Sequence, residues 1–155
     1  MKFEKLIKER YSCRKFKGKA VEQEKIDKIL EAGLVAPTAC NLQPQRILVL
    51  TDKDKIKALD EEKCTRYTFD APLIFVMCVD RAKAWTRKYD NLSSAEVDSS
   101  IVLTHMMLQA QELGLGTTWV MAFNPEIAKK VLNIPETFSG KCMLHCLLDG
   151  GIFRW

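Results

Sequence analysis

Two arginines around a serine are the residues of this chain best suited to chemistry. Arg10, Ser12 and Arg14 stand at alternate positions near the N-terminus. A guanidinium offers a planar fork of N–H donors that can bind a phosphate through two hydrogen bonds, and it stays charged at any physiological pH. The serine hydroxyl adds a donor between the forks. The three residues form a candidate phosphate clamp, although charge spacing alone favours a solvated basic turn.

The elements that must position this clamp begin with a short helix. Phe3, Leu6 and Ile7 fall at helical spacing, which predicts a helix from Lys2 to Glu9 that delivers the clamp at its exit. The C-terminal end of a helix carries partial negative charge and repels anions. A phosphate bound here must therefore be held by the side chains and by backbone amides beyond the turn.

Hydrophobic periodicity predicts the remaining elements. Several helices precede the first strand, and this order favours an α+β fold over alternating βαβ units. The expected helices are Glu22–Val35 with a buried stripe of Ile26, Ile29, Leu30, Gly33 and Leu34, a helix capped within Thr51–Asp54 and ending near Asp60, Ser94–Leu113 opened by a capping box at Ser93–Glu96, and Pro125–Leu132. The expected strands are Ile47–Leu50, Leu73–Val79, Thr117–Met121 and Met143–Leu148.

Two of these segments have unusual composition. Ala36 to Gln45 is a proline-bounded loop of small and amide residues, with Pro37 ending the helix before it. The helix Ser94–Leu113 is apolar around most of its circumference. We therefore expect it to be buried on nearly all sides, by its own domain or by a partner subunit.

Size and composition indicate one soluble domain spanning residues 1–155. The net charge of +4 is modest and both signs are interleaved, which argues against nucleic-acid binding. No apolar run is long enough to cross a bilayer, so we expect a cytoplasmic protein without membrane contact. The six cysteines lack a Cys-x-x-Cys pair and are expected as free thiols. Cys142, His145 and Cys146 could supply metal ligands, but an apolar strand explains them better, and no metal is expected.

No residue set for acid–base or nucleophilic catalysis stands out. The only histidines, His105 and His145, occur in apolar stretches. Gly114-Leu115-Gly116 follows a helix and precedes a strand, which is the wrong order for a dinucleotide-binding fingerprint. A nucleotide-like site without such residues suits a protein whose cofactor performs the chemistry.

Four segments, in order, resemble the nitroreductase family. They are Arg10-Tyr11-Ser12-Cys13-Arg14-Lys15-Phe16, Ala36-Pro37-Thr38-Ala39-Cys40-Asn41-Leu42-Gln43-Pro44, Ala71-Pro72 before an apolar strand, and Asp98 heading the long helix into Gly114-Leu115-Gly116-Thr117-Thr118-Trp119. The resemblance implies a central, mostly antiparallel sheet flanked by helices. It also implies an intertwined homodimer with a flavin mononucleotide (FMN) in each of two interfacial sites.

The resemblance also assigns roles to individual residues. Arg10, Tyr11, Ser12 and Arg14 would bind the phosphate and ribityl end of FMN; Pro37, Thr38, Ala39 and Asn41 would reach the ring of the neighbouring subunit's flavin; Trp119, Val120 and Met121 would lie beside its pyrimidine side and N5. Ordinary structural roles compete at several of these positions: Pro37 ends a helix, Asn41 suits a turn, and Trp119 suits strand packing.

The implied activity is an FMN-dependent oxidoreductase. NADH or NADPH would donate a hydride that passes through the flavin to a small-molecule acceptor, such as a nitroaromatic or a quinone, in ping-pong fashion. We expect no side chain of the protein to act as a general acid. The alternatives are a non-catalytic flavin- or nucleotide-binding module of the same fold, and a family member with dehalogenase or flavin-degrading activity.

The chain departs from the family pattern at three places. Met121 stands where glycine is usual, and Gln45 where an aromatic is usual. The usual Gly-Tyr-Pro turn and basic C-terminal segment are replaced by Leu148–Trp155, in which Arg154 is the one basic residue. Weaker flavin binding or a less stable dimer would follow from this change.

Overall fold

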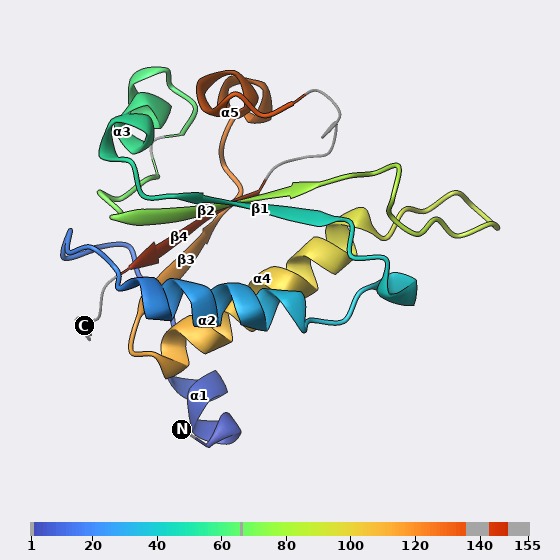
Figure 1. Cartoon of the computed structure of the whole chain (residues 1–155), viewed down its shortest axis with the longest axis horizontal. Helices are drawn as coiled ribbons and strands as arrows, with labels where there is room; N and C mark the ends of the chain where they lie inside the picture. The colour runs from blue at the N-terminus through green and yellow to red at the C-terminus, as the bar shows by residue number, and fades with distance from the viewer. Residues whose placement is uncertain (1, 66, 136–142, 149–155) are drawn as a thin grey trace.

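Four antiparallel strands form one sheet with helices on both faces (Figure 1). The structure is a computed structural model that describes residues 2–65, 67–135 and 143–148. This architecture confirms the expected α+β fold with a central antiparallel sheet flanked by helices. The strands are β1 (Gln45–Leu50), β2 (Leu73–Val79), β3 (Gly116–Val120) and β4 (Met143–Leu148), in spatial order β1-β2-β4-β3. The helices are α1 (Phe3–Glu9), α2 (Gln23–Leu34), α3 (Lys53–Glu61), α4 (Ala95–Glu112) and α5 (Pro125–Leu132), with a 3₁₀ turn, η1 (Ala39–Asn41).

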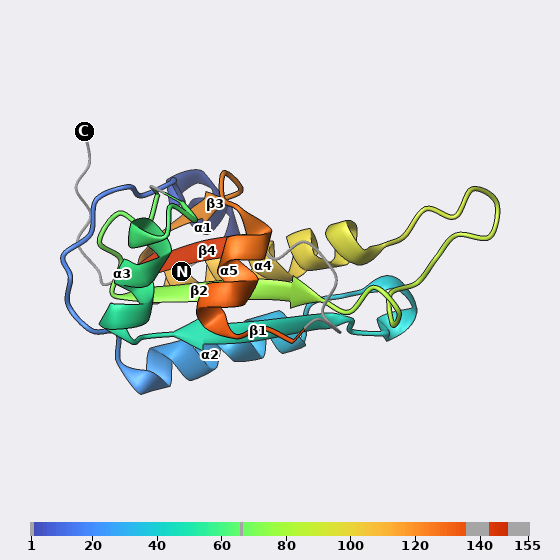
Figure 2. The ribbon, with the colours of Figure 1, turned by 90° about the horizontal axis from the view of Figure 1, so that it is seen from above.

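The sheet separates two layers of helices. α2 and α4 lie on one face with α1 beyond them, and α3 and α5 cover the other (Figures 1 and 2). Strand β2 lies between them, and every one of its residues is buried. Its continuous apolar sequence is therefore explained by burial on both faces, as the sequence predicted.

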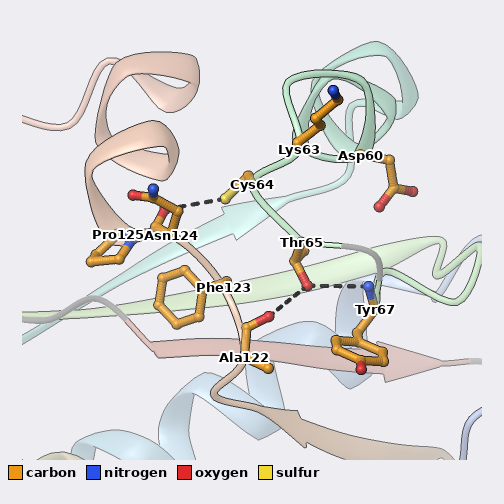
Figure 3. Close-up of a pocket in the computed structure, with 9 residues that line it drawn as sticks. All are labelled: Asp60, Lys63, Cys64, Thr65, Tyr67, Ala122, Phe123, Asn124 and Pro125. Carbon is orange, nitrogen blue, oxygen red and sulfur yellow. Dashed lines mark hydrogen bonds between the residues drawn. The ribbon is translucent and has the colours of Figure 1, made fainter.

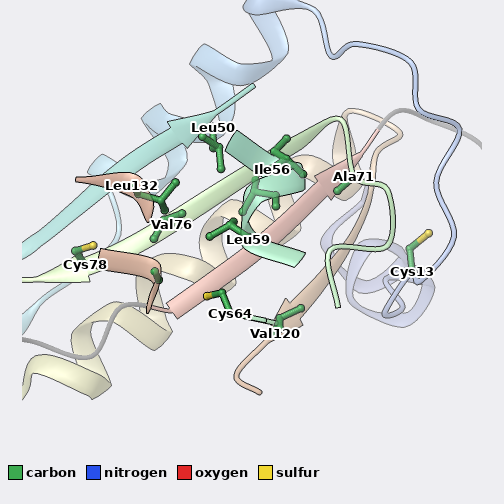
Figure 4. Close-up of a cluster of buried hydrophobic side chains, with 12 residues drawn as sticks. Cys13, Leu50, Ile56, Leu59, Cys64, Ala71, Val76, Cys78, Val120 and Leu132 are labelled. Carbon is green, nitrogen blue, oxygen red and sulfur yellow. The ribbon is translucent and has the colours of Figure 1, made fainter. Parts of the chain in front are cut away.

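Each face of β2 contributes to a separate core. On the α4 side, Phe75 and Met77 pack with Leu103 and Met106 of α4 and with Ile29 of α2, all fully buried. On the other side, α3 and α5 close over a second cluster (Figure 4). That cluster contains Cys13, Leu50, Ile56, Leu59, Cys64, Ala71, Val76, Cys78, Val120 and Leu132, together with Ile74 and Ala128.

Helix α4 is not covered all round by its own chain. Val97 is 57% exposed, and Thr104 is exposed one to two turns further along. Leu34 of α2, which the sequence placed in a buried stripe, is 61% exposed. That prediction was wrong because α2 packs on α4 through Ile26, Ile29 and Gly33, and Leu34 lies beyond the contact. This helical layer therefore presents apolar side chains to solvent.

The predicted capping box at the start of α4 is also wrong. Ser94 is the N-cap residue but has helical backbone angles, and its side chain makes no capping bond. Its hydroxyl instead donates to Oδ2 of Asp98 at 2.6 Å. Ser93 Oγ accepts a hydrogen bond from the backbone N–H of Ala95 at 3.3 Å. The Ser94 hydroxyl thus bonds to the side chain of Asp98 within the helix and does not take part in a capping box.

A long excursion between β2 and α4 projects from the body of the molecule (Figures 1 and 2). Its two sides meet at a bridge between Thr86 and Ser93. Near the tip, the guanidinium of Arg87 donates to both carboxylate oxygens of Asp90, at 2.8 and 2.6 Å, and this bond lowers the pKa of Asp90. Tyr89 at the tip is 96% exposed.

None of the helices in the described part of the chain is long and apolar enough to cross a membrane.

The segment after α1 is fixed to the start of β3. The backbone N–H of Cys13 donates to the carbonyl of Thr117 at 2.8 Å, and Ser12 forms a parallel bridge with the same residue. Cys13 is buried and lies directly against Gly116. A Cβ at Gly116 would be 2.9 Å from Cβ and 3.0 Å from Sγ of Cys13. Only glycine allows this approach without a shift of one backbone.

We predict that Gly116→Ala destabilises the protein by about 1–3 kcal/mol, because the added methyl group forces the two segments apart. Urea unfolding measures the change. The matched variant is Gly116→Ala combined with Cys13→Gly, which removes the opposing Cβ. If the contact is the cause, the double variant is less destabilised than the sum of the single variants. Simple additivity of the two effects would contradict this explanation.

Candidate functional site

The candidate phosphate clamp lies where α1 ends and the chain meets β3. Arg10 is the C-cap residue of α1, and its backbone N–H donates to the carbonyl of Leu6. Arg14 is exposed, and its guanidinium makes one long contact, 3.4 Å, with the carbonyl of Ser12. Neither guanidinium pairs with a carboxylate among the described residues. Both arginines therefore keep donors available for an anion.

Tyr11 differs from its neighbours in the clamp. Its ring packs against the core on the α3 and α5 side. Burial raises the pKa of its hydroxyl, and the nearby Cys13 thiol raises it further. The tyrosine therefore stays protonated at neutral pH and holds the segment to the body of the protein, while Arg14 faces solvent.

The proline-bounded loop forms a tight turn with three residues in the left-handed region. Cys40, Asn41 and Gln43 have φ of 51°, 52° and 46°. Thr38 closes the turn, since its carbonyl accepts from the N–H of Asn41 at 3.0 Å and its hydroxyl from the N–H of Gln43 at 3.1 Å. Pro37 and Asn41 are exposed, and Thr38 and Ala39 are half-buried. The four predicted residues of this loop thus form one small exposed surface.

The third predicted group is at the end of β3. Val120 is buried in the core, so its backbone alone is available to a ligand. Met121 is 71% exposed. Trp119 is half-buried against the α4 core, and its indole Nε1 is buried without a hydrogen-bond partner among the described residues. An indole N–H is a donor only, so this atom needs an acceptor.

Strand register shows which groups one chain brings together. The clamp adjoins Thr117 at the start of β3, and Met121 follows the other end of the strand. β3 is an edge strand of five residues, roughly 16 Å long. The clamp and the Trp119–Met121 segment therefore share one exposed sheet edge.

The proline-bounded loop lies elsewhere in the same chain. It leads into β1, the opposite edge of the sheet, at the end where Gln45 pairs with Val79. The loop meets the first turn of α4 through Ala39, whereas the clamp lies by the last turn of that helix. α4 has 18 residues and is roughly 27 Å long. Within a single chain, the loop and the clamp are therefore far apart.

Two hollows of similar size lie on opposite sides of the sheet. A groove of about 800 Å³ runs between α1, α2 and α4, lined mainly by apolar side chains that include Phe3, Val35 and Leu108. A second pocket of about 780 Å³ lies between the end of α3 and the start of α5 (Figure 3). Asn124 and Cys64 are among its lining residues, and the Asn124 N–H donates to the Cys64 carbonyl at 2.8 Å. Neither hollow contains the clamp.

The described residues hold no cluster of three or more His, Cys, Asp or Glu side chains that could bind a metal. Cys142 and the side chains of His145 and Cys146 lie outside what the structure describes, as do Arg154 and the rest of the C-terminal segment. Burial raises the pKa of the Cys64 thiol, and this favours its neutral form. Cys64 Sγ lies 3.4 Å from the carbonyl of Asn124, which supports a structural role.

Sequence reasoning did not assign a role to Asp98 or Gln45. Asp98 is 2% exposed, and its Oδ1 accepts a hydrogen bond from the N–H of Ala39 at 2.9 Å. Gln45 is buried, and its Oε1 has no partner among the described residues. The signal for Asp98 was an acid in the first turn of an apolar helix, but its partner is distant in sequence.

Comparison with known proteins agrees with this geometry. The sequence pattern of the nitroreductase family matches residues 7–67 and 61–148. A crystal structure of a nitroreductase family protein from Clostridium difficile superposes with a TM-score of 0.89 and 37% identity, covering 100% of this chain and 88% of the other. An FMN-dependent nitroreductase from the same species gives a TM-score of 0.78 at 29% identity, covering 96% of this chain and 88% of that one.

A curated relative points the same way. An NADPH-dependent oxidoreductase of Staphylococcus haemolyticus is 30% identical over 146 residues, which cover 84% of this chain. The match spans 58% of that relative's own length. The order of the sequence motifs, the antiparallel sheet with its two helical layers, and the family match over residues 7–148 agree. The chain belongs to the nitroreductase family.

Proposed function

We propose that this chain is an FMN-dependent oxidoreductase that works as a homodimer. When bound, FMN would supply the redox chemistry, accepting a hydride from NADH or NADPH and passing it to a nitroaromatic, quinone or similar acceptor in ping-pong order. The observation that carries the proposal is the β3 edge. It has at one end two arginines that pair with no carboxylate among the described residues, and the exposed Met121 follows its other end.

The clamp suits a terminal phosphate. Arg14 is exposed and forms no ion pair with a described residue, so binding a phosphate breaks no existing salt bridge. Arg10 is the C-cap residue of α1. Ser12 is held against β3 by its bridge with Thr117. Because the backbone at Ser12 and Cys13 is fixed by β3, its conformational entropy is not lost again when a phosphate binds, and the arginine side chains are the groups that become ordered.

The far end of β3 suits a flat polar ring. The strand is an edge strand, so its outer backbone groups can bond a ligand that lies alongside. The outer backbone N–H groups of the strand are donors, and hydrogen-bond donors near a reduced flavin stabilise its negative charge. Met121 extends from the same end and would narrow the space beside the ring. The residues present therefore fit FMN.

A second copy of the chain would complete the site. Phe3, Leu34, Val35 and Val97 are exposed apolar residues on the helical layer formed by α1, α2 and α4. A two-fold axis through this layer pairs identical surfaces and can place the N-terminal end of one α4 near the C-terminal end of the other. The loop of one copy would then approach the clamp and the β3 edge of its neighbour. The names of the relatives, NADPH-dependent oxidoreductase and FMN-dependent nitroreductase, support this activity.

The visible spectrum of the purified protein tests the proposed function. We expect the absorption bands of oxidised flavin, in the protein as isolated or after addition of FMN, and bleaching of these bands by NADH or NADPH under anaerobic conditions. Protein that takes up no FMN would overturn the proposal. Protein that binds FMN but is bleached by neither reductant would be a non-catalytic flavin-binding module.

Arg14→Ala is expected to weaken FMN binding by about 1.5–3 kcal/mol, because a charge-assisted hydrogen bond to the phosphate is lost. Fluorescence titration measures the dissociation constant. Lys15→Ala is the matched control, since it removes one positive charge from the next, equally exposed position. If both variants bind FMN as tightly as the wild type, Arg14 belongs to the solvated surface. Equal weakening in both would indicate general electrostatic attraction rather than a clamp.

Val97→Asp is expected to shift the protein from dimer to monomer, because it places a charge within the proposed apolar interface. Sedimentation velocity gives the mass. Val97 is exposed in the single chain, so the variant should still fold. Lys55→Asp on α3, on the opposite face of the sheet, is the control and should remain dimeric. A Val97→Asp monomer that binds FMN with wild-type affinity would contradict a shared site.

A further inference from the structure

The loop between α2 and β1 adopts a backbone conformation that its residues do not favour. Cys40, Asn41 and Gln43 all have positive φ, and none of them is glycine. Non-glycine residues in this region typically cost about 1 kcal/mol or more each, and asparagine tolerates it best. Such a turn persists only where surrounding contacts hold it.

Most of the loop's hydrogen bonds are local. Thr38 bonds to Asn41 and Gln43, the Ala39 carbonyl accepts from Leu42, and Gln43 Nε2 donates to the carbonyl of Leu34 at 2.9 Å. These bonds define the shape of the turn. They tie the turn to itself and to the end of α2, and none of them joins it directly to helix α4.

Asp98 supplies a direct hydrogen bond between α4 and the loop. Its Oδ1 accepts from the backbone N–H of Ala39 at 2.9 Å, across 59 positions in sequence. Its Oδ2 accepts from the Ser94 hydroxyl at 2.6 Å, so both oxygens have partners and the carboxylate cannot rotate freely. The side chain is buried and stands in the first turn of α4, where the helix dipole favours negative charge.

The same network reaches the base of the projecting excursion. The backbone N–H of Ser94 donates to the carbonyl of Trp85 at 2.8 Å. Ser94 and Asp98 therefore join three segments: the excursion, the start of α4 and the proline-bounded loop.

We propose that Asp98 is a positioning residue that sets the proline-bounded loop at a fixed place on α4, so that Pro37, Thr38, Ala39 and Asn41 meet the flavin ring of a second copy in one geometry. This inference rests on the proposed FMN site. Asp98 is buried behind the loop, so it acts on the flavin through Ala39. Because α4 also carries the exposed apolar side chain of Val97, one helix relates the loop to the proposed interface.

Hydrogen exchange on the flavin-free protein tests the tether independently of any cofactor. In Asp98→Ala the amides of residues 38–43, between the two prolines, should exchange at least about tenfold faster than in the wild type, because the Ala39 N–H loses its acceptor. Asp98→Asn is the matched variant. Its amide oxygen can accept from Ala39 and its NH₂ can donate to the Ser94 hydroxyl, so protection should be kept. Amides of β2 serve as the internal reference. Unchanged exchange in Asp98→Ala would overturn the tether.

FMN titration then tests the effect on the site. Asp98→Ala should raise the dissociation constant about tenfold or more and change the shape of the visible spectrum of bound flavin, whereas Asp98→Asn should restore both. Arg14→Ala is the comparison: it should weaken binding but leave the ring spectrum unchanged. Faster loop exchange without a change in either affinity or spectrum would overturn the positioning role.

Two further outcomes are distinguishable. If the wild-type protein binds no FMN, the proposed function fails, and the exchange data alone decide whether Asp98 holds the loop. If Asp98→Ala does not fold, Ser94→Ala replaces it. That variant frees Oδ2 while leaving the bond to Ala39, and it should accelerate loop exchange in the same direction by a smaller factor. No acceleration in Ser94→Ala would count against the network.

Discussion

The packing of α4 on the central strand is the constraint on which the rest of the molecule depends. Phe75 and Met77 of β2 meet Leu103 and Met106 of α4 with no exposed surface left on any of them. Burying four such side chains contributes on the order of several kcal/mol, which is comparable with the whole net stability of a domain of this size. Yet α4 carries more apolar surface than one sheet and α2 can cover, and Val97 remains exposed. One side of α4 therefore stabilises the fold, and part of another side remains exposed to solvent.

Each end of α4 is joined to a segment that has little structure of its own. At the C-terminal end, Cys13 bonds to Thr117 and lies against Gly116, and this holds the arginines. At the N-terminal end, Asp98 bonds to Ala39 and holds the proline-bounded loop. Both contacts are short, involve backbone groups, and are at least partly buried, so they are specific in position. The length of α4 thereby sets the distance between the two segments.

The sequence predicted those features that depend on local periodicity. β2 was recognisable because seven consecutive apolar residues need cover on both faces, and α5 because Asn124 and Pro125 mark a helix start; the Asn124 side chain does accept from the N–H groups of residues 126 and 127. Features that depend on distant partners were not predictable. The exposure of Leu34 follows from where α4 crosses α2, and the Ser94 hydroxyl bonds to Asp98 instead of capping. The left-handed residues Cys40 and Gln43 carry no glycine signal. The predicted roles of the clamp and loop residues in flavin binding remain predictions, because the sequence shows residue types and the fold shows only their placement.

Two buried polar atoms lie close in sequence to the segments proposed to bind flavin. Oε1 of Gln45 and Nε1 of Trp119 have no hydrogen-bond partner among the described residues. Leaving such an atom unsatisfied costs about 1–3 kcal/mol, and native folds seldom keep the cost without a use for the group. Gln45 directly follows the proline-bounded loop, and Trp119 belongs to the β3 edge that begins beside the clamp. Unsatisfied atoms thus occur next to the two segments that a second copy and a flavin would bring together in the proposed dimer.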